Sequence, residues 1–256
     1  MRVARVDENL FEFYAFASAA AGKPCVREGG YSYLRLQPSP WVNAVYALDF
    51  PDGRELPASL AEGVRSGRLP NQIRVGPSSR PADIEARLRE AGFALDSEAR
   101  GMILDMARRR GFPVPEGLSI RRIEAEGDFL SSSRLVATEL FKSGSESAPP
   151  FAELLGSLAS DRAFGFLGLL RGEPASTAFA FIDGEGGAGL YFVATAAPLR
   201  ARGFAKAVIS AVLDELERRA CPSCILQATE LGKPAFESLG FEDACALSRY
   251  RLPIEA

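Results

Sequence analysis

Residues 191–206 read Tyr191-Phe192-Val193-Ala194-Thr195-Ala196-Ala197-Pro198-Leu199-Arg200-Ala201-Arg202-Gly203-Phe204-Ala205-Lys206. The first five residues are β-branched, aromatic or small, which suits a buried strand. Pro198 ends any further ladder pairing, and a turn of small residues follows. From residue 204 onward, apolar residues recur at helical spacing on one face, and polar residues fill the other. This stretch therefore predicts a strand, a turn and an amphipathic helix that runs to about residue 220.

The turn itself predicts an anion site. The first backbone N–H groups of a helix have no partners within it, and with the positive end of the helix dipole they suit a phosphate or diphosphate. Gly203 and Ala205 have little or no side chain, so an anionic group can approach the backbone closely. Arg200, Arg202 and Lys206 add positive charge. An ordinary strand-to-helix connection explains the turn equally well, so a second motif is needed.

The spacing of this turn differs from that of the commoner phosphate loops. The sequence contains no Gly-x-x-x-x-Gly-Lys-Ser/Thr, and no Gly-x-Gly-x-x-Gly follows a strand near the start, which argues against nucleotide binding. Instead, Arg200-x-x-Gly203-x-Ala205 resembles the acetyl-coenzyme A loop of the GNAT superfamily of N-acetyltransferases, which is Arg/Gln-x-x-Gly-x-Gly/Ala after a strand.

A second segment strengthens this resemblance. Residues 225–229 suit a strand, and residues 232–241 suit a short helix that begins near Pro234 and ends at Gly240. GNAT proteins end in a similar strand, a short helix and a Leu-Gly-Phe, here at residues 239–241. The two motifs occur in the family's order and cover roughly Leu118 to Pro253. The resemblance implies an α+β fold in which helices flank a mixed, mostly antiparallel twisted sheet, the acyl-CoA N-acyltransferase fold, in tandem.

The first half predicts a related series of elements. We expect a helix within residues 1–30, strands at 31–36, 41–50, 72–75 and 99–106, and helices at 56–64 and 81–91, with turns at 37–40 and 51–53. Leu88-Arg89-Glu90-Ala91-Gly92-Phe93 before a strand echoes residues 236–241 before another. Residues 1–107 are therefore interpreted as a degenerate GNAT-like domain that cannot hold coenzyme A. Coincidence is the alternative, because a Gly often ends a helix.

A boundary is expected at residues 108–117, where arginines, prolines and glycines gather. We interpret this segment as a solvated linker rather than as a nucleic-acid contact. Residues 118–256 then form the GNAT acetyltransferase domain. It should contain a strand at 118–123, helices at 129–141 and 150–159 that shape the acceptor pocket by resemblance, and a hairpin of strands at 164–170 and 175–182.

Composition narrows the class of partner. The 256 residues carry a net charge of −3, which argues against nucleic acid or an anionic membrane as the main partner. No apolar run reaches the roughly 18 residues of a membrane helix, and the first residues are charged, so a cytoplasmic protein is expected. Without any His, Cys221 and Cys224 make a poor metal site, and no metal is expected. They are interpreted as two plain thiols at the start of a strand, with a redox pair as the alternative.

The resemblance also implies roles for particular residues. Backbone groups of Val193 and Thr195, with Ala194 between them, would hold the pantetheine arm and the acetyl carbonyl. Thr229 and Phe236 would line the far side of the thioester. The diphosphate would bind the turn, through the amides of Arg200, Ala201, Arg202, Gly203, Phe204, Ala205 and Lys206.

Two features depart from the family pattern. Phe236 stands where a Tyr general acid is frequent, and residues 190–195 include no carboxylate to act as the base. The base would have to be Glu139, Glu185, Glu230 or a chain of waters, although each of these carboxylates also suits a solvated surface. Thr229 and Tyr191 are the candidate catalytic residues, as proton relays.

The sequence therefore predicts an acetyl-CoA-dependent N-acetyltransferase whose acceptor is a small-molecule or peptide amine. The two departures favour an alternative from another class, a protein that binds and senses acyl-CoA without catalysis. The tandem arrangement raises a third reading, an aminoacyl or long-chain acyl transferase.

Overall fold

The computed structural model describes residues 3–23, 25–36, 43–50 and 56–253. The turns expected at 37–40 and 51–53 and the first two residues of the strand expected at 41–50 lie outside these ranges. The chain divides into two compact units, one of Met1–Gly101 with Ala244–Ala256 and the other of Met102–Asp243.

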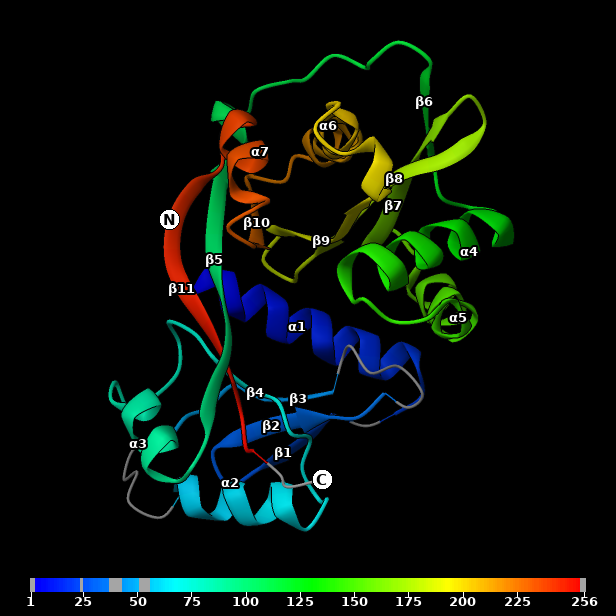
Figure 1. The fold of residues 1–256 in the computed structure, drawn as a ribbon. Coiled ribbons are helices and arrows are strands. Elements are labelled where there is room, and N and C mark those ends of the chain that lie inside the picture. The colour runs from blue at the N-terminus through cyan, green and yellow to red at the C-terminus, as the bar shows by residue number, and fades with distance from the viewer. Residues whose placement is uncertain (1–2, 24, 37–42, 51–55, 254–256) are drawn as a thin grey trace. The chain divides into compact units, whose positions relative to one another are not determined.

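Within the described residues, the first unit consists of adjacent, mostly short strands and the helices α1, α2 and α3. Its strand order is β1-β2-β3-β4-β11, with β3 and β4 parallel and β4 and β11 antiparallel. The expected order of elements is present, with differences in extent. The first helix ends at Ala20 and a short strand follows it. Among the described residues, the strand expected at 41–50 covers only Ala44–Tyr46, and the strand expected at 99–106 begins at Ala94. The elements, coloured blue to teal in Figure 1 apart from the red β11, are α1 (Arg5–Ala20), β1 (Val26–Glu28), β2 (Tyr31–Leu34), β3 (Ala44–Tyr46), α2 (Leu56–Arg65), β4 (Ile73–Val75), α3 (Ile84–Glu90), the start of β5 (Ala94–Asp105) and most of β11 (Glu242–Arg251).

Asp7 on α1 is a buried carboxylate in this unit. Its Oδ2 accepts hydrogen bonds from the Ser78 backbone N–H at 3.0 Å and from the Ser78 hydroxyl at 2.6 Å. Burial raises the pKa of Asp7 above its ordinary value, and the hydrogen bonds from Ser78 only partly oppose that rise.

This carboxylate predicts a pH dependence of stability. Between the unfolded pKa and the raised folded pKa, the folded chain binds more protons, so the free energy of unfolding falls as pH rises through that window. Asp7→Asn should lack this component. Urea unfolding of both proteins from pH 4 to 7 measures it. Parallel pH profiles of the two proteins would contradict the assignment.

The second unit contains the strand–turn–helix stretch. Its strand order is the end of β5, then β10-β9-β8-β7-β6, with β9 and β10 parallel and the successive pairs from β6 to β9 antiparallel. Figure 1 shows α6 on one side of these strands and α4 and α5 on the other. The elements are β6 (Leu118–Arg122), α4 (Glu126–Leu135), α5 (Ala148–Leu158), β7 (Ala163–Leu170), β8 (Glu173–Ile182), β9 (Ala188–Thr195), α6 (Phe204–Arg218), β10 (Ser223–Ala228) and α7 (Lys233–Ser238).

These elements confirm the predicted α+β class, with helices flanking a mixed, mostly antiparallel sheet. The apolar face predicted for α6 forms the core of the second unit, where Val208, Val212 and Leu216 are fully buried against β5, β8 and β10. Burial of each such side chain stabilises the fold by about 1.5–3 kcal/mol before entropy is counted.

Two strands continue from one unit into the other along the chain. β5 begins in the first unit and ends beside β10 in the second, whereas β11 begins in the second unit and pairs with β4 in the first. The compact units therefore differ from the predicted division at 108–117 in where they place residues 102–107 and 244–256. The predicted division follows from the arginines, prolines and glycines at 108–117, and this composition does not specify which strand pairs with which.

Residues 109–115, the covering segment, lie along α6. Arg109 donates to Asp214 at 2.7 Å and to Glu217 at 2.6 Å, and the backbone N–H of Phe112 donates to the Ser210 hydroxyl at 3.1 Å. Arg108 and Arg110 are exposed, as expected of a solvated linker. Arg109 and Phe112 instead bind α6 through the hydrogen bonds just given. As a result, Ser210 on the predicted polar face of α6 is buried.

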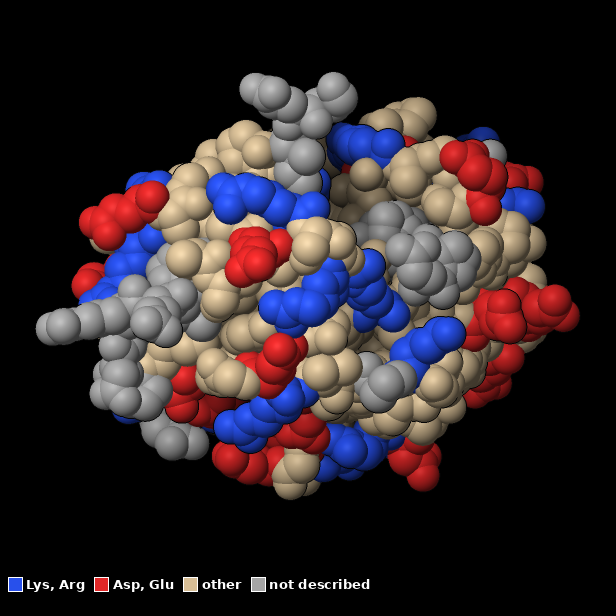
Figure 2. All heavy atoms as spheres, turned by 90° about the horizontal axis from the view of Figure 1, so that it is seen from below, with Lys and Arg blue, Asp and Glu red and all other residues tan. Residues whose placement is uncertain are grey.

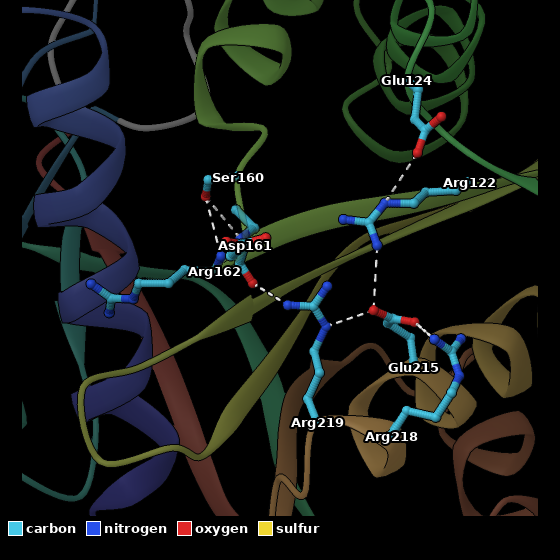
Figure 3. Close-up of polar contacts among 9 residues, drawn as sticks. Arg122, Glu124, Ser160, Asp161, Arg162, Glu215, Arg218 and Arg219 are labelled. Carbon is cyan, nitrogen blue, oxygen red and sulfur yellow. Dashed lines mark hydrogen bonds and ion pairs between the residues drawn. The ribbon is translucent and has the colours of Figure 1, made fainter.

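Glu215 is the centre of an ion-pair network at the other end of α6 (Figure 3). Its buried carboxylate accepts from Arg219 Nε at 2.6 Å and from Arg122 Nη1 at 3.3 Å, and it also pairs with Arg218. Burial by itself would raise the pKa of Glu215, but the hydrogen bond from Arg219 and the three positive charges outweigh burial and lower that pKa.

The surface shows no expanse of one charge on the face seen in Figure 2, where the described Lys and Arg side chains are interspersed with Asp and Glu. Among the described residues, no helix combines the length and the apolar character that crossing a membrane requires.

Candidate functional site

Strand β9 contains a bulge at Phe192. Phe192 has φ 53°, a left-handed conformation that costs an L residue about 1–2 kcal/mol. Between the pairs Phe179–Tyr191 and Thr177–Ala194, β9 has one residue more than β8. A bulge of this kind bends a strand and redirects its edge.

The bulge coincides with the point where β9 and β10 separate. Their described parallel register ends at the pair Leu226–Leu190, although both strands continue beyond it. On the side of β9 that faces β10, the backbone groups of residues 191–195 therefore lie beyond the last strand pair. They are available to hydrogen-bond an extended ligand that lies between the two strands. The expected pantetheine-binding residues, Val193 to Thr195, lie in this stretch.

The turn after β9 leads directly into the N-terminus of α6. It contains a short 3₁₀ turn at Ala197–Leu199, followed by left-handed conformations at Ala201 (φ 59°) and Gly203 (φ 82°). Gly203 is the N-cap residue, and no side chain caps the helix there. The first N–H groups of a helix that lacks a side-chain cap point out of its N-terminus, where they suit an anion.

The cations expected around the turn are held in different ways. Arg202 lies over the ring of Phe204 at 4.9 Å, and Lys206 Nζ lies 4.0 Å from the ring centre of Phe112 in the covering segment. Both stay beside the helix N-terminus. The guanidinium of Arg200 instead donates to Glu139 at 2.6 Å.

Gly203 is also constrained from outside. A Cβ at this position would lie 2.7 Å from the Phe112 ring, closer than real Cβ contacts. Both the positive φ and the close ring therefore require glycine at Gly203.

The residues expected on the β10 side lie at its end and on α7. Thr229 is exposed, and its hydroxyl accepts a hydrogen bond from the Gly232 N–H at 3.3 Å. Phe236 is buried in the core with its ring centre 5.9 Å from that of Phe241, which gives the aromatic residue a packing role. Tyr191 is buried on β9 at the bulge.

The three carboxylates considered as bases have separate surroundings. Glu139 binds the turn itself, through Arg200 and Ala197. Glu185 is exposed in the turn before β9, so the length of β9 places it more than roughly 20 Å from the turn that follows. Glu230 is exposed next to Thr229.

Sequence reasoning missed the bulge and one polar side chain. Gln227 follows the last β9–β10 pair, and its Nε2 is buried with no hydrogen-bond partner among the described residues. The core cluster holds Cys224, Leu226 and Ala228, so Gln227 belongs to the opposite face of the strand. The sequence signal that could have identified this residue was a Gln within an otherwise apolar strand.

The described residues contain no group of three or more His, Cys, Asp or Glu side chains that could hold a metal ion. Among the described residues, no cysteine forms a disulfide. Burial raises the pKa of both Cys221 and Cys224, which makes them poor nucleophiles at neutral pH.

Comparisons with known proteins establish the fold. No family model and no curated protein matches the sequence. Among solved structures, a GCN5-related N-acetyltransferase from Kribbella flavida aligns with TM-score 0.71 at 14% identity, over 99% of this chain and 96% of that chain. A tandem GNAT protein from the clavulanic acid biosynthesis pathway aligns with TM-score 0.62 at 14% identity, over 98% and 97%. A GCN5-related N-acetyltransferase from Sphaerobacter thermophilus aligns with TM-score 0.61 at 17% identity, over 83% and 74%. Over nearly its whole length, the chain has the fold of the GNAT N-acetyltransferases.

Proposed function

We propose that the chain is an acyl-CoA-dependent N-acyltransferase that moves an acetyl group from acetyl-CoA to an amine. The observation that carries this proposal is the separation of β9 from β10 directly before an uncapped helix N-terminus. Together these features offer a strand edge to an extended amide-containing arm and backbone donors to a diphosphate, at the two places where coenzyme A needs them.

The residues of the second unit have defined tasks in this proposal. Backbone groups of Val193, Ala194 and Thr195 hold the pantetheine arm and polarise the acyl carbonyl, as an oxyanion hole does. The amides of residues 200–206 hold the diphosphate. Thr229 and Phe236 bound the thioester on the other side, and Thr229 or Tyr191 relays a proton between the amine and the departing thiolate.

A non-catalytic acyl-CoA sensor remains the second candidate. Two observations favour it: Phe236 has no proton to donate and is buried, and Glu139, the candidate base nearest the turn, has both carboxylate oxygens engaged. Transfer of a longer acyl or an aminoacyl group is the third candidate, and a tandem GNAT structure is among the similar folds.

One assay separates these functions. Purified protein is mixed with acetyl-CoA or longer acyl-CoA and a panel of small-molecule and peptide amines, and free thiol is followed over time. Amine-dependent thiol release with acetyl-CoA is expected. Binding of acetyl-CoA without amine-dependent release would support the sensor, and release only with longer donors would support the third candidate.

We also propose that residues 1–107 are a degenerate copy of the GNAT domain. Glycines with φ 92° at Gly92 and 102° at Gly240 end α3 and α7, and in each case the next residue, Phe93 or Phe241, donates its N–H back into the helix. Each helix then leads into a long strand. Each unit also has a parallel strand pair, β3–β4 in the first and β9–β10 in the second. In the sheet, β4 adjoins β11, which follows α7, and β10 adjoins β5, which follows α3.

A further inference from the structure

Glu139 lies where the helical segment that follows α4 meets the turn after β9. It belongs to a π-helical turn at Val136–Leu140, which directly extends α4. Turns of this kind are rare and are frequent at functional sites. The Glu139 side chain is only 16% exposed.

Both oxygens of the Glu139 carboxylate bind the turn. Oε1 accepts the backbone N–H of Ala197 at 3.0 Å, and Oε2 accepts Arg200 Nη2 at 2.6 Å. These two partners stand at the start of the 3₁₀ turn and directly after it. Arg200 Nε also donates to the Thr195 carbonyl at 3.4 Å. One side chain therefore fixes the path of the backbone from the end of β9 to the start of the anion-binding turn.

Charge-assisted bonds of this length are about twice as strong as neutral ones. Because they join an amide and a guanidinium to one carboxylate, they restrain both the backbone and the Arg200 side chain. The guanidinium of Arg200 is then committed to Glu139, which leaves Arg202 and Lys206 as the cations beside the helix N-terminus.

We propose that Glu139 is a positioning residue that preorganises the diphosphate turn, and that it is not a proton acceptor. This inference rests on the proposed binding of coenzyme A at that turn. A preformed turn loses less conformational entropy when it binds an anion, so the ordered turn binds more tightly.

The direction in which diphosphate affinity changes when Glu139 is removed distinguishes a positioning role from a simple charge effect. If Glu139 only neutralised Arg200, removing its charge would free Arg200 and strengthen binding of a diphosphate. If Glu139 positions the turn, its removal weakens binding despite the gain in positive charge.

The test measures coenzyme A binding by titration calorimetry. Glu139→Ala is expected to weaken binding about tenfold, and Glu139→Gln, which keeps an acceptor for Ala197, about threefold. Glu153→Gln on the exposed side of α5 makes the same charge change and should bind as the wild type does. Arg200→Ala combined with Glu139→Ala should weaken binding no more than either single change. Unchanged or tighter binding by folded Glu139→Ala would overturn the proposal, as would additive effects.

Hydrogen exchange keeps this result separate from the proposed function. The Ala197 amide should be protected in the wild type and exchange faster in Glu139→Ala, without any ligand. If the wild type fails to bind coenzyme A, the proposed function fails whatever this amide does. If the Ala197 amide exchanges equally in both proteins, the positioning role fails even where coenzyme A binds.

Discussion

Gly203→Val is expected to weaken coenzyme A binding at least about 100-fold, or about 2.7 kcal/mol. Gly203 has φ 82°, and a β-branched residue in that conformation is strained by more than the roughly 1–2 kcal/mol of an ordinary L residue. Its Cβ would also lie 2.7 Å from the Phe112 ring. Relief of either conflict rotates the peptide groups that present the first amides of α6.

Gly186→Val is the matched control for this experiment. Gly186 has φ 81° but no atom within 4 Å of an added Cβ, and it lies in the turn before β9. The control therefore suffers similar backbone strain without disturbing the diphosphate turn. Calorimetric titration with coenzyme A should show wild-type affinity for Gly186→Val. Equal losses in the two variants would mean that general destabilisation, and not the turn, explains the effect.

Glu215→Ala is expected to lower the free energy of unfolding by about 3 kcal/mol at pH 7, because it leaves arginines around a buried site without their shared partner. Urea unfolding followed by circular dichroism measures this change. Since the pKa of Glu215 is lowered in the folded chain, its contribution to stability is fully present above the ordinary pKa of a glutamate and is lost as pH falls through the lowered, folded value. The difference between wild type and variant should therefore narrow in acid.

Glu124 provides the control, because it pairs with Arg122, which also binds Glu215. Glu124 approaches Arg122 Nε at 3.7 Å and is 76% exposed, so Glu124→Ala should cost about 0.5 kcal/mol or less. A Glu215→Ala loss as small as that of Glu124→Ala would show that the network in Figure 3 adds little to stability.

Local patterns explain why much of the fold was predictable. The periodicity of α6, the Pro and Gly that bound α7, and the small residues between β9 and α6 each depend on neighbours along the chain. The candidate anion turn was found for the same reason, because a strand and a helix that share a short connection must place it at the helix N-terminus.

Other features depend on residues distant in sequence. Glu139 and Arg200 are separated by 61 positions, and nothing near either one indicates the other. A Phe rarely adopts positive φ, so Phe192 gave no sign of the bulge that separates β9 from β10. The sheet neighbours of β5 and β11 could not be predicted either, because the residue pattern of a strand does not specify the strand with which it pairs.

The most direct test is a crystal structure with coenzyme A bound. The account predicts the diphosphate oxygens within about 3 Å of the backbone nitrogens of residues 203–206, with the pantetheine arm between β9 and β10 beyond Leu190. A diphosphate bound elsewhere, with those amides turned away from it, would contradict the account.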